Sequence, residues 1–370
     1  MIVRDASLLD FRNFTSLRLG LGQGVNILCG ANAQGKTNFL EALYFCATGR
    51  SRRTNFDREL IRFESHDAYM QLHIQNENME DRIDAHIKKD GPKGFAVNGI
   101  PIRRLGDLFG VLLIVMFSPE DLQLVKSGPS ERRRFYDMEL CQLSPIYYYD
   151  LQQYYKILKQ RNALLKRLQK EKDNSLKESL GVWDEQLVAY GIKIVSARRL
   201  FTEKMSRLAG EMHQKVTSGL EELQVVYRPN AGESDFADKL RRNIDRDIYA
   251  GTTGVGVHKD DAAFYINGLD ARLYGSQGQQ RTVSLSLKLA ELELIKEDKN
   301  ETPVLLLDDV FSELDADRQR CLLQSISGVQ TILTCTGVED ILREYGEHVE
   351  TRLYIVENGR IIERDGVKNA

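Results

Sequence analysis

The sequence contains no long uninterrupted apolar run. The longest, Val111 to Phe117, covers seven residues, whereas a helix that crosses a bilayer needs about 20. The N-terminus, which begins Met1-Ile2-Val3-Arg4-Asp5, lacks the apolar stretch that a signal peptide requires. We therefore expect a cytoplasmic protein with no membrane partner.

Cysteine is scarce and scattered. The five cysteines lie at positions 29, 46, 141, 321 and 335, and no two of them form a Cys-x-x-Cys pair. This spacing favours neither a disulfide framework nor a zinc site, so we expect reduced, buried thiols. Positive charge is not in excess either, because the formal net charge is −3. Any nucleic-acid surface must therefore be a local patch.

Both ends of the chain carry strand signals, and the middle does not. Alternating or apolar segments predict strands at 8–11, 15–19, 25–29, 69–75 and 82–88. Asn-Gly pairs at 98–99, 267–268 and 358–359 predict tight hairpins. Apolar stripes over 151–168 and 183–212 predict two long helices that form an antiparallel arm. We predict one α/β domain, 1–117 with 251–370, interrupted by a mainly helical arm domain, 118–250.

A glycine-rich loop follows the strand 25–29. It matches the phosphate-loop pattern G-x-x-x-x-G-K-[S/T], in which the glycines permit the backbone N–H groups to wrap phosphates. Lys36 reaches the β- and γ-phosphates, and the Thr37 hydroxyl binds Mg²⁺. A strand before the loop and an amphipathic helix after it complete the expected context. The predicted ATP or GTP site consists of Gly30, Ala31, Asn32, Ala33, Gln34, Gly35, Lys36 and Thr37.

An apolar strand that ends in two carboxylates is the second motif. Val304 to Leu307 is typical of a strand buried on both faces of a parallel sheet, and ligands bind at the end where the acids follow. We expect Asp308 to hold the Mg²⁺ shell, and Asp309 to orient or deprotonate the attacking water. Alone, the motif also fits a strand that ends in a polar turn. About 270 residues separate the loop from these acids, so an insertion must split the nucleotide fold.

The third motif opens a long helix whose apolar face runs from Val283 to Leu294. The helix begins with Ser276-Gln277-Gly278-Gln279, so its first N–H groups form a second anion site. A plain N-cap by Ser276 is an equally good interpretation of these residues alone. Their position some 25 residues before the acidic strand favours the anion site.

In this order the three motifs resemble the head domain of the ATP-binding-cassette ATPases. Ser276-x-Gly278-Gln279 stands in the place of the signature motif, and Ser312-Glu313-Leu314-Asp315 matches the D-loop. Across nearly the whole chain the resemblance narrows to the RecF family of recombination mediators, which are related to SMC-like ATPases. The segments that carry it are 9–14, 30–37, 49–54, 117–122, 130–135, 256–261 and 307–315.

The resemblance implies a P-loop ATPase head with a mixed sheet, in which the signature of one subunit caps the γ-phosphate held by another. Lys36, Asp308 and Asp309 would be catalytic, Thr37 and Asp308 would bind Mg²⁺, and Ser276, Gly278 and Gln279 would contact the partner's ATP. It further implies an ATP-dependent homodimer that binds double-stranded DNA near single-strand gaps and junctions. Its partners would be RecR and RecO, and indirectly RecA, in recombinational repair and replication restart. A weak, DNA-stimulated ATPase would release the DNA.

Several positions depart from the family pattern. Val257 and Lys259 replace a Pro and an Arg, and should loosen the local turn. The strand 331–336 has no switch His after it, and Asp309 replaces a Glu and is one methylene shorter. We therefore expect slow hydrolysis that suits a timed switch.

Other classes of protein share these motifs. An ABC transporter ATPase subunit should carry the switch His and a signature nearer Leu-Ser-Gly-Gly-Gln. An SMC-like structural DNA-bridging ATPase needs hundreds of heptad residues, whereas this arm offers about 60. A nuclease joined to such a head needs a further acidic cluster after Asp317, and the sequence has none.

Basic residues cluster at three places and could neutralise DNA phosphates. The clusters are Arg132, Arg133 and Arg134 before the arm; Arg50, Arg52 and Arg53 after the first helix; and Lys156, Lys159, Lys166, Arg167 and Lys170 on the first arm helix. For the arm helix, a solvated charged face is the plainer interpretation. We predict DNA contacts at Arg132 to Arg134, without sequence readout, because no groove-reading motif appears.

Overall fold

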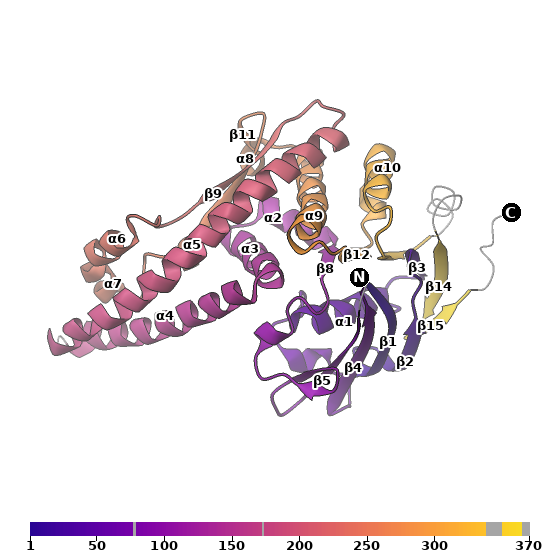
Figure 1. Ribbon diagram of the computed structural model, residues 1–370, viewed down its shortest axis with the longest axis horizontal. Coiled ribbons are helices and arrows are strands. Elements are labelled where there is room, and N and C mark those ends of the chain that lie inside the picture. Colours follow the sequence, from indigo (N-terminus) through magenta and orange to yellow (C-terminus); the bar gives the residue numbers. More distant parts are fainter. Residues whose placement is uncertain (77–78, 172–173, 338–349, 365–370) are drawn as a thin grey trace. The chain divides into compact units, whose positions relative to one another are not determined.

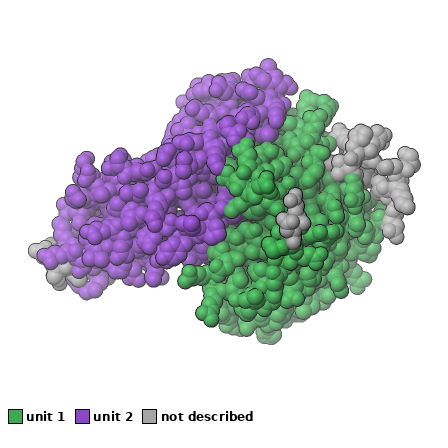
Figure 2. Space-filling model, in the orientation of Figure 1, with its two compact units in different colours: residues 1–121, 285–370 green, residues 122–284 purple. Residues whose placement is uncertain are grey.

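The computed structural model describes residues 1–76, 79–171, 174–337 and 350–364. The chain divides into two compact units, which Figure 2 distinguishes by colour. Unit 1 comprises Met1–Asp121 and Leu285–Ala370, and unit 2 comprises Leu122–Ser284. One unit therefore interrupts the other along the sequence.

Unit 1 contains a six-stranded mixed sheet. Its strand order is β15 (Arg360–Glu363), β14 (Thr351–Glu357), β3 (Val25–Cys29), β13 (Thr331–Cys335), β12 (Val304–Asp308) and β8 (Ile114–Phe117). Strands β14 to β8 run parallel, and β15 pairs antiparallel with β14. Every residue of β3, β12, β13 and β8 is buried, as expected for apolar strands covered on both faces. The predicted mixed sheet is confirmed.

A second, antiparallel sheet forms the other layer of unit 1. Its order is β2 (Phe14–Gly20), β1 (Ile2–Phe11), β4 (Asp67–Gln75), β5 (Glu80–Lys88), β6 (Gly94–Val97) and β7 (Ile100–Pro101). Burial alternates along β4 and β5, so one face of the sheet packs inward. Helix α1 (Lys36–Thr48) contacts strands of both sheets, and its apolar side chains join a core that both sheets share.

Two further helices contribute to unit 1, and the first of them, α9 (Gln277–Lys299), begins in unit 2 and enters unit 1 at Leu285. Helix α9 precedes β12, and α10 (Ala316–Ser325) lies between β12 and β13 in the sequence. Leu285, Leu289 and Leu292 of α9 are all buried, in agreement with the apolar faces predicted from the sequence. Figure 1 shows both helices in orange.

Unit 2 is mainly helical. Its helices are α2 (Gln123–Lys126), α3 (Pro129–Leu143), α4 (Pro145–Glu171), α5 (Asn174–Val216), α6 (Phe236–Arg242), α7 (Ile244–Ala250) and α8 (Ala271–Tyr274). Helices α4 and α5 form the predicted antiparallel arm (Figure 1): Arg198 Nε donates to Tyr147 Oη at 3.1 Å, and Arg161 Nε donates to Asp184 at 2.6 Å.

A three-stranded sheet with the order β11 (Leu269–Asp270), β10 (Asp261–Ile266), β9 (Leu223–Arg228) lies in unit 2. Because β10 pairs with β9, residues 251–284 belong to the same compact unit as the arm. The sequence predicts that the head resumes at residue 251. The compact unit instead continues to Ser284, beyond the end of the predicted arm domain at residue 250. The boundary of the arm as an independent folding domain stays a prediction.

The local predictions agree closely with these elements. All five predicted strands are present, and the Asn-Gly pairs at 98–99, 267–268 and 358–359 join β6 to β7, β10 to β11 and β14 to β15. The first residue of each pair has a positive φ, the backbone conformation that such turns require. Among the described residues, no helix has the length and apolar character that a membrane span needs.

Candidate functional site

The phosphate loop runs from the end of β3 to the start of α1, and two of its positions require glycine. A Cβ on Gly30 would lie 2.3 Å from the carbonyl oxygen of Val356, on the neighbouring strand β14. Gly35 has a φ of +118°, and a Cβ there would lie 2.6 Å from Asn13 Nδ2. The glycines of the motif are therefore needed for close packing of the loop as well as for its curvature.

Lys36 is the first residue of α1, and its ammonium group lies inside the loop. Its Nζ donates to the carbonyl oxygens of Gly30 at 2.6 Å and Ala31 at 2.9 Å. The side chain is 7 % exposed. The positive charge and the N-terminus of the helix dipole thus meet at the same place, where both favour an anion.

Two turns that are distant in sequence hold the loop at Gln34. Asn13 Nδ2 donates to the Gln34 carbonyl at 2.9 Å, and Asn13 Oδ1 accepts from Asn38 Nδ2 at 2.9 Å. From the β14–β15 hairpin, Asn358 N donates to Gln34 Oε1 at 2.7 Å and Gly359 N to the Gln34 carbonyl at 3.2 Å. Sequence reasoning missed these roles: Asn13 appeared only within a family-like segment, and Asn358-Gly359 only as a turn.

The acidic strand meets the phosphate loop at Asp308. Its Oδ1 accepts from the hydroxyls of Thr37 and Thr334, each at 2.9 Å. Burial raises the pKa of Asp308, while these two hydrogen bonds act in the opposite direction. Thr37 and Asp308, which were each predicted to bind Mg²⁺, thus lie in contact, whereas the role of Thr334 was missed because no local pattern marks it.

Asp309 follows in a strained backbone conformation. Its φ is 53°, in the left-handed region that a non-glycine residue seldom occupies. The Asp309 N–H donates to Thr334 Oγ1 at 2.9 Å, and its carbonyl accepts from Ser312 Oγ at 2.8 Å. Ser312 belongs to the predicted D-loop, and Asp315 at its end caps α10 by accepting from Arg318 N at 3.0 Å.

The oxygen atoms of Thr37 and Asp308 suit Mg²⁺. Within the described ranges no group of three or more His, Cys, Asp or Glu side chains could hold a metal. Mg²⁺ at a nucleotide site needs only one or two protein ligands, because phosphates and water supply the rest. A hydroxyl and a carboxylate 2.9 Å apart therefore fit this ion.

The start of α9 has the geometry of a capping box. Ser276 Oγ accepts from Gln279 N at 3.2 Å, and Gln279 Oε1 accepts from Ser276 N at 2.9 Å. The N-cap interpretation is thus confirmed, and it does not exclude the anion site, because the Ser276 hydroxyl keeps a proton to donate. Ser276 and Gly278 are both exposed.

The burial of Arg132 argues against the predicted DNA contact at this residue. The side chain is 3 % exposed. Its guanidinium donates to Asp261 at 2.7 and 3.1 Å, and to the carbonyls of Leu124 and Ser127 at 3.2 and 2.7 Å. These contacts use four of the five N–H groups of Arg132 inside unit 2, which leaves little of the guanidinium for a phosphate. Arg134 is exposed, and its role with DNA stays a prediction.

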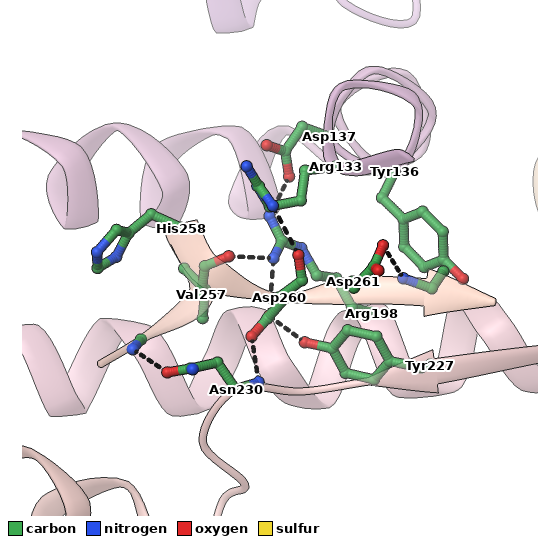
Figure 3. A network of polar contacts seen from close by, with 12 residues as sticks. Arg133, Tyr136, Asp137, Arg198, Tyr227, Asn230, Val257, His258, Asp260 and Asp261 are labelled. Carbon is green, nitrogen blue, oxygen red and sulfur yellow. Dashed lines mark hydrogen bonds and ion pairs between the residues drawn. The ribbon is translucent and has the colours of Figure 1, made fainter. Parts of the chain in front are cut away.

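The segment 256–261 is the centre of a polar network in unit 2 (Figure 3). Arg198, 1 % exposed, donates to Asp260 and to the Val257 carbonyl at 2.8 Å, and to Asp137 at 2.7 Å. Arg133 Nη1 donates to the Asp260 carbonyl at 2.8 Å. Hydrogen bonds from α3 and α5 thus hold the turn that contains Val257 and Lys259, and its loosening relative to the family pattern stays a prediction.

His258 and Tyr227 belong to the same network. His258 Nδ1 lies 2.9 Å from Tyr154 Oη, and its Nε2 lies 3.0 Å from the Thr253 carbonyl. Burial lowers the pKa of His258. Tyr227 Oη donates to Asp260, whose pKa burial raises. These contacts give the family-like segment a structural role in joining helices to the small sheet.

Of the remaining basic clusters, the one after α1 is partly engaged within unit 1. Arg52 pairs with buried Asp121 at 2.6 Å, and Arg53 donates to Asn38 at 2.9 Å and contacts Glu41 at 3.5 Å. The predicted basic cluster of the first arm helix is different, because its five side chains are all exposed, whereas Arg161 of the same helix is buried. The five exposed side chains are Lys156, Lys159, Lys166, Arg167 and Lys170.

These features define a class of protein. A phosphate loop after one parallel strand, an acidic pair two strands away, and a helix opened by Ser-x-Gly-Gln are the parts of an ATP-binding-cassette ATPase head. The family described as RecF/RecN/SMC N terminal domain matches residues 2–356. The chain belongs to the RecF family within it.

Individual relatives support this assignment. The chain is 49% identical to the DNA replication and repair protein RecF of Lachnoclostridium phytofermentans, over 98% of this chain and 99% of that protein. Identity to RecF of Lachnospira eligens is also 49%, over 92% and 94%. A solved RecF-ATP structure from the RecFOR pathway superimposes with a TM-score of 0.91 at 34% identity, covering 98% and 97%. An SMC head bound to a winged-helix domain of ScpA, at 15% identity and a TM-score of 0.58, shares the fold.

Proposed function

We propose that the chain is an ATP-driven DNA clamp of recombinational repair and replication restart that works as a homodimer. The hydrogen bond between Thr37 and Asp308 carries the proposal, because it brings the phosphate loop and the acidic strand to one point. A triphosphate bound there would be capped by the signature segment, Ser276 to Gln279, of a second copy. Each copy would thus supply half of two nucleotide sites.

Each residue of the half-site has a defined task. Lys36 would neutralise the β- and γ-phosphates, and the loop N–H groups would wrap them. Thr37 and Asp308 would hold Mg²⁺, which supplies positive charge to the phosphates. Asp309 would orient or deprotonate the attacking water. Because Asp309 is one methylene shorter than Glu and no switch His follows β13, hydrolysis should be slow and would time the release of DNA.

The proposed partner is double-stranded DNA near single-strand gaps and junctions. Relatives named as replication and repair proteins support this role, as does a solved RecF described as a recombination mediator of the RecFOR pathway. The exposed basic side chains of α4, with Arg134, are the proposed phosphate contacts. RecR and RecO, and RecA through them, would be protein partners in the cytoplasm. DNA should stimulate the ATPase.

Sedimentation with and without ATP, with and without duplex DNA, and at two salt concentrations tests the proposal. We expect a monomer that becomes a dimer in ATP and then binds DNA with salt-dependent affinity. Ser276→Arg should bind ATP nearly as tightly as the unaltered chain and yet remain monomeric, because the larger cation blocks the trans contact. Ser234→Arg, at another exposed serine of unit 2, is the matched control.

Two outcomes would contradict the clamp. The first is a chain that hydrolyses ATP at a normal rate at high dilution with no association. The second is a Ser276→Arg variant that still dimerises in ATP, which would remove the signature from the nucleotide site.

A further inference from the structure

The signature residue Gln279 is held by a carboxylate from another element. Its Nε2 donates to Glu221 Oε1 at 2.8 Å, while its Oε1 accepts from Ser276 N at 2.9 Å. Both polar atoms of the Gln279 side chain are therefore engaged within unit 2. Rotation of this side chain would break both hydrogen bonds, so together they favour one orientation of the first turn of α9.

Glu221 is itself held by a buried histidine. His213, which is 0 % exposed and lies near the end of α5, places its Nε2 3.1 Å from Glu221 Oε2. A carboxylate oxygen can accept from the ring nitrogen when Nε2 carries the proton. The two oxygens of Glu221 thus take one donor each, from His213 and from Gln279.

The backbone around Glu221 is fixed on both sides. Gly219, with a φ of +80°, turns the chain after α5 and donates its N–H to the Gln214 carbonyl at 2.8 Å. Beyond Glu221, Glu222 N donates to Asn267 Oδ1 at 2.8 Å, and Asn267 N donates to the Glu222 carbonyl at 2.9 Å. The carboxylate therefore reaches Gln279 from a rigid position.

We propose that Glu221 is a positioning residue for the nucleotide site shared between two copies. It fixes Gln279, and through Gln279 the capping box, so that the Ser276 hydroxyl and the first N–H groups of α9 face the partner's γ-phosphate. A carboxylate near a triphosphate would normally repel it, but donors from His213 and Gln279 occupy both of its oxygens and offset the charge. The inference rests on the proposed trans role of the signature.

The test separates ATP binding from dimerisation. Glu221→Ala should leave the ATP dissociation constant within about 2-fold, because the phosphate loop is untouched. It should weaken the ATP-dependent dimer by about 10-fold in sedimentation, because a Gln279 side chain that Glu221 no longer holds must be ordered at each of the two shared sites. Glu221→Gln, which can still accept from Gln279, should restore the dimer to within about 3-fold. Glu222→Ala, at the neighbouring position, is the control.

Two further variants keep the test decisive. Glu221→Asp retains the charge but is one methylene too short to bond both partners, and it should weaken the dimer even if Glu221→Ala fails to fold. In the Gln279→Ala background, Glu221→Ala should have little additional effect, because the two residues act as one unit.

The possible failures are distinguishable. If Glu221→Asp and folded Glu221→Ala dimerise like the unaltered chain while Ser276→Arg does not, the positioning role is wrong and the shared site stands. If the unaltered chain does not dimerise in ATP, the proposed function fails and this inference fails with it.

Discussion

The Thr37 hydroxyl donates a 2.9 Å hydrogen bond to Asp308 Oδ1, although 271 residues separate the two in sequence. Thr37 follows β3, and Asp308 ends β12. Strand β13 lies between these two strands and contributes Thr334, whose hydroxyl donates to the same oxygen. Polar groups at or after the ends of three neighbouring strands thus lie together at the carboxyl ends of the strands, where open α/β sheets bind ligands.

Removing the loop ammonium should abolish useful nucleotide binding. Lys36→Ala should weaken ATP affinity by about 100-fold in calorimetry, because a charged hydrogen bond to phosphate contributes about 1.5–3 kcal/mol and neutralisation of the phosphates is removed as well. Lys89→Ala, at an exposed lysine, should bind as before. Unchanged affinity in Lys36→Ala would remove the loop from the nucleotide site.

The raised pKa of Asp308 predicts a trade between stability and activity. Burial favours the protonated carboxyl in the fold, so this group's stabilising contribution is complete below its unfolded pKa of 3.8 and is lost as the pH rises through the folded pKa. Without nucleotide, Asp308→Asn should therefore be more stable than the unaltered chain at pH 7. The gain should narrow as the pH falls towards 3.8. ATP hydrolysis should fall by about 100-fold.

Urea denaturation between pH 8 and pH 4.5 measures that gain, and Asp90→Asn, at an exposed aspartate, is the control. A constant difference across the pH range would show that burial of the charge is not the cause. An Asp308→Asn variant with full ATPase activity would remove Asp308 from the catalytic set.

Arg132 should matter for folding and not for DNA. Arg132→Ala leaves Asp261 without its ion pair and should cost about 2–3 kcal/mol in urea denaturation, less than for a fully buried pair because Asp261 is 26 % exposed. DNA affinity per folded molecule should not change. Arg241→Ala, at a side chain that is 80 % exposed, should alter stability little. Weakened DNA binding by a fully folded Arg132→Ala would return this arginine to the DNA surface.

The exposed lysines of α4 should set the salt dependence of DNA binding. Reversing Lys156, Lys159 and Lys166 to Glu should weaken binding, and the slope of log affinity against log salt should fall by about 0.9 for each phosphate that is no longer neutralised. Filter binding at several salt concentrations measures the slope. The same reversal at exposed Lys88, Lys89 and Lys299 of unit 1 is the control. An unaltered slope in the α4 variant would show that these lysines do not contact DNA phosphates.

Short patterns were enough to predict much of the local structure. The phosphate loop, the acidic strand and the Asn-Gly hairpins each depend on neighbours within about ten residues, so their residue types specify them. Charge patterns were less informative. A run of three arginines looks alike on a surface and in a core, and only the position of Asp261 shows that Arg132 is buried.

The sequence by itself determined which residues could bind a triphosphate, because the chemistry of phosphate and Mg²⁺ requires particular side chains at fixed spacing. The tertiary structure alone decided which distant groups support them. Asn13 and Asn358 reach Gln34, Thr334 reaches Asp308, and Glu221 reaches Gln279. Such contacts arise from strand order and helix packing, and those bring together residues whose separation along the chain carries no local signal.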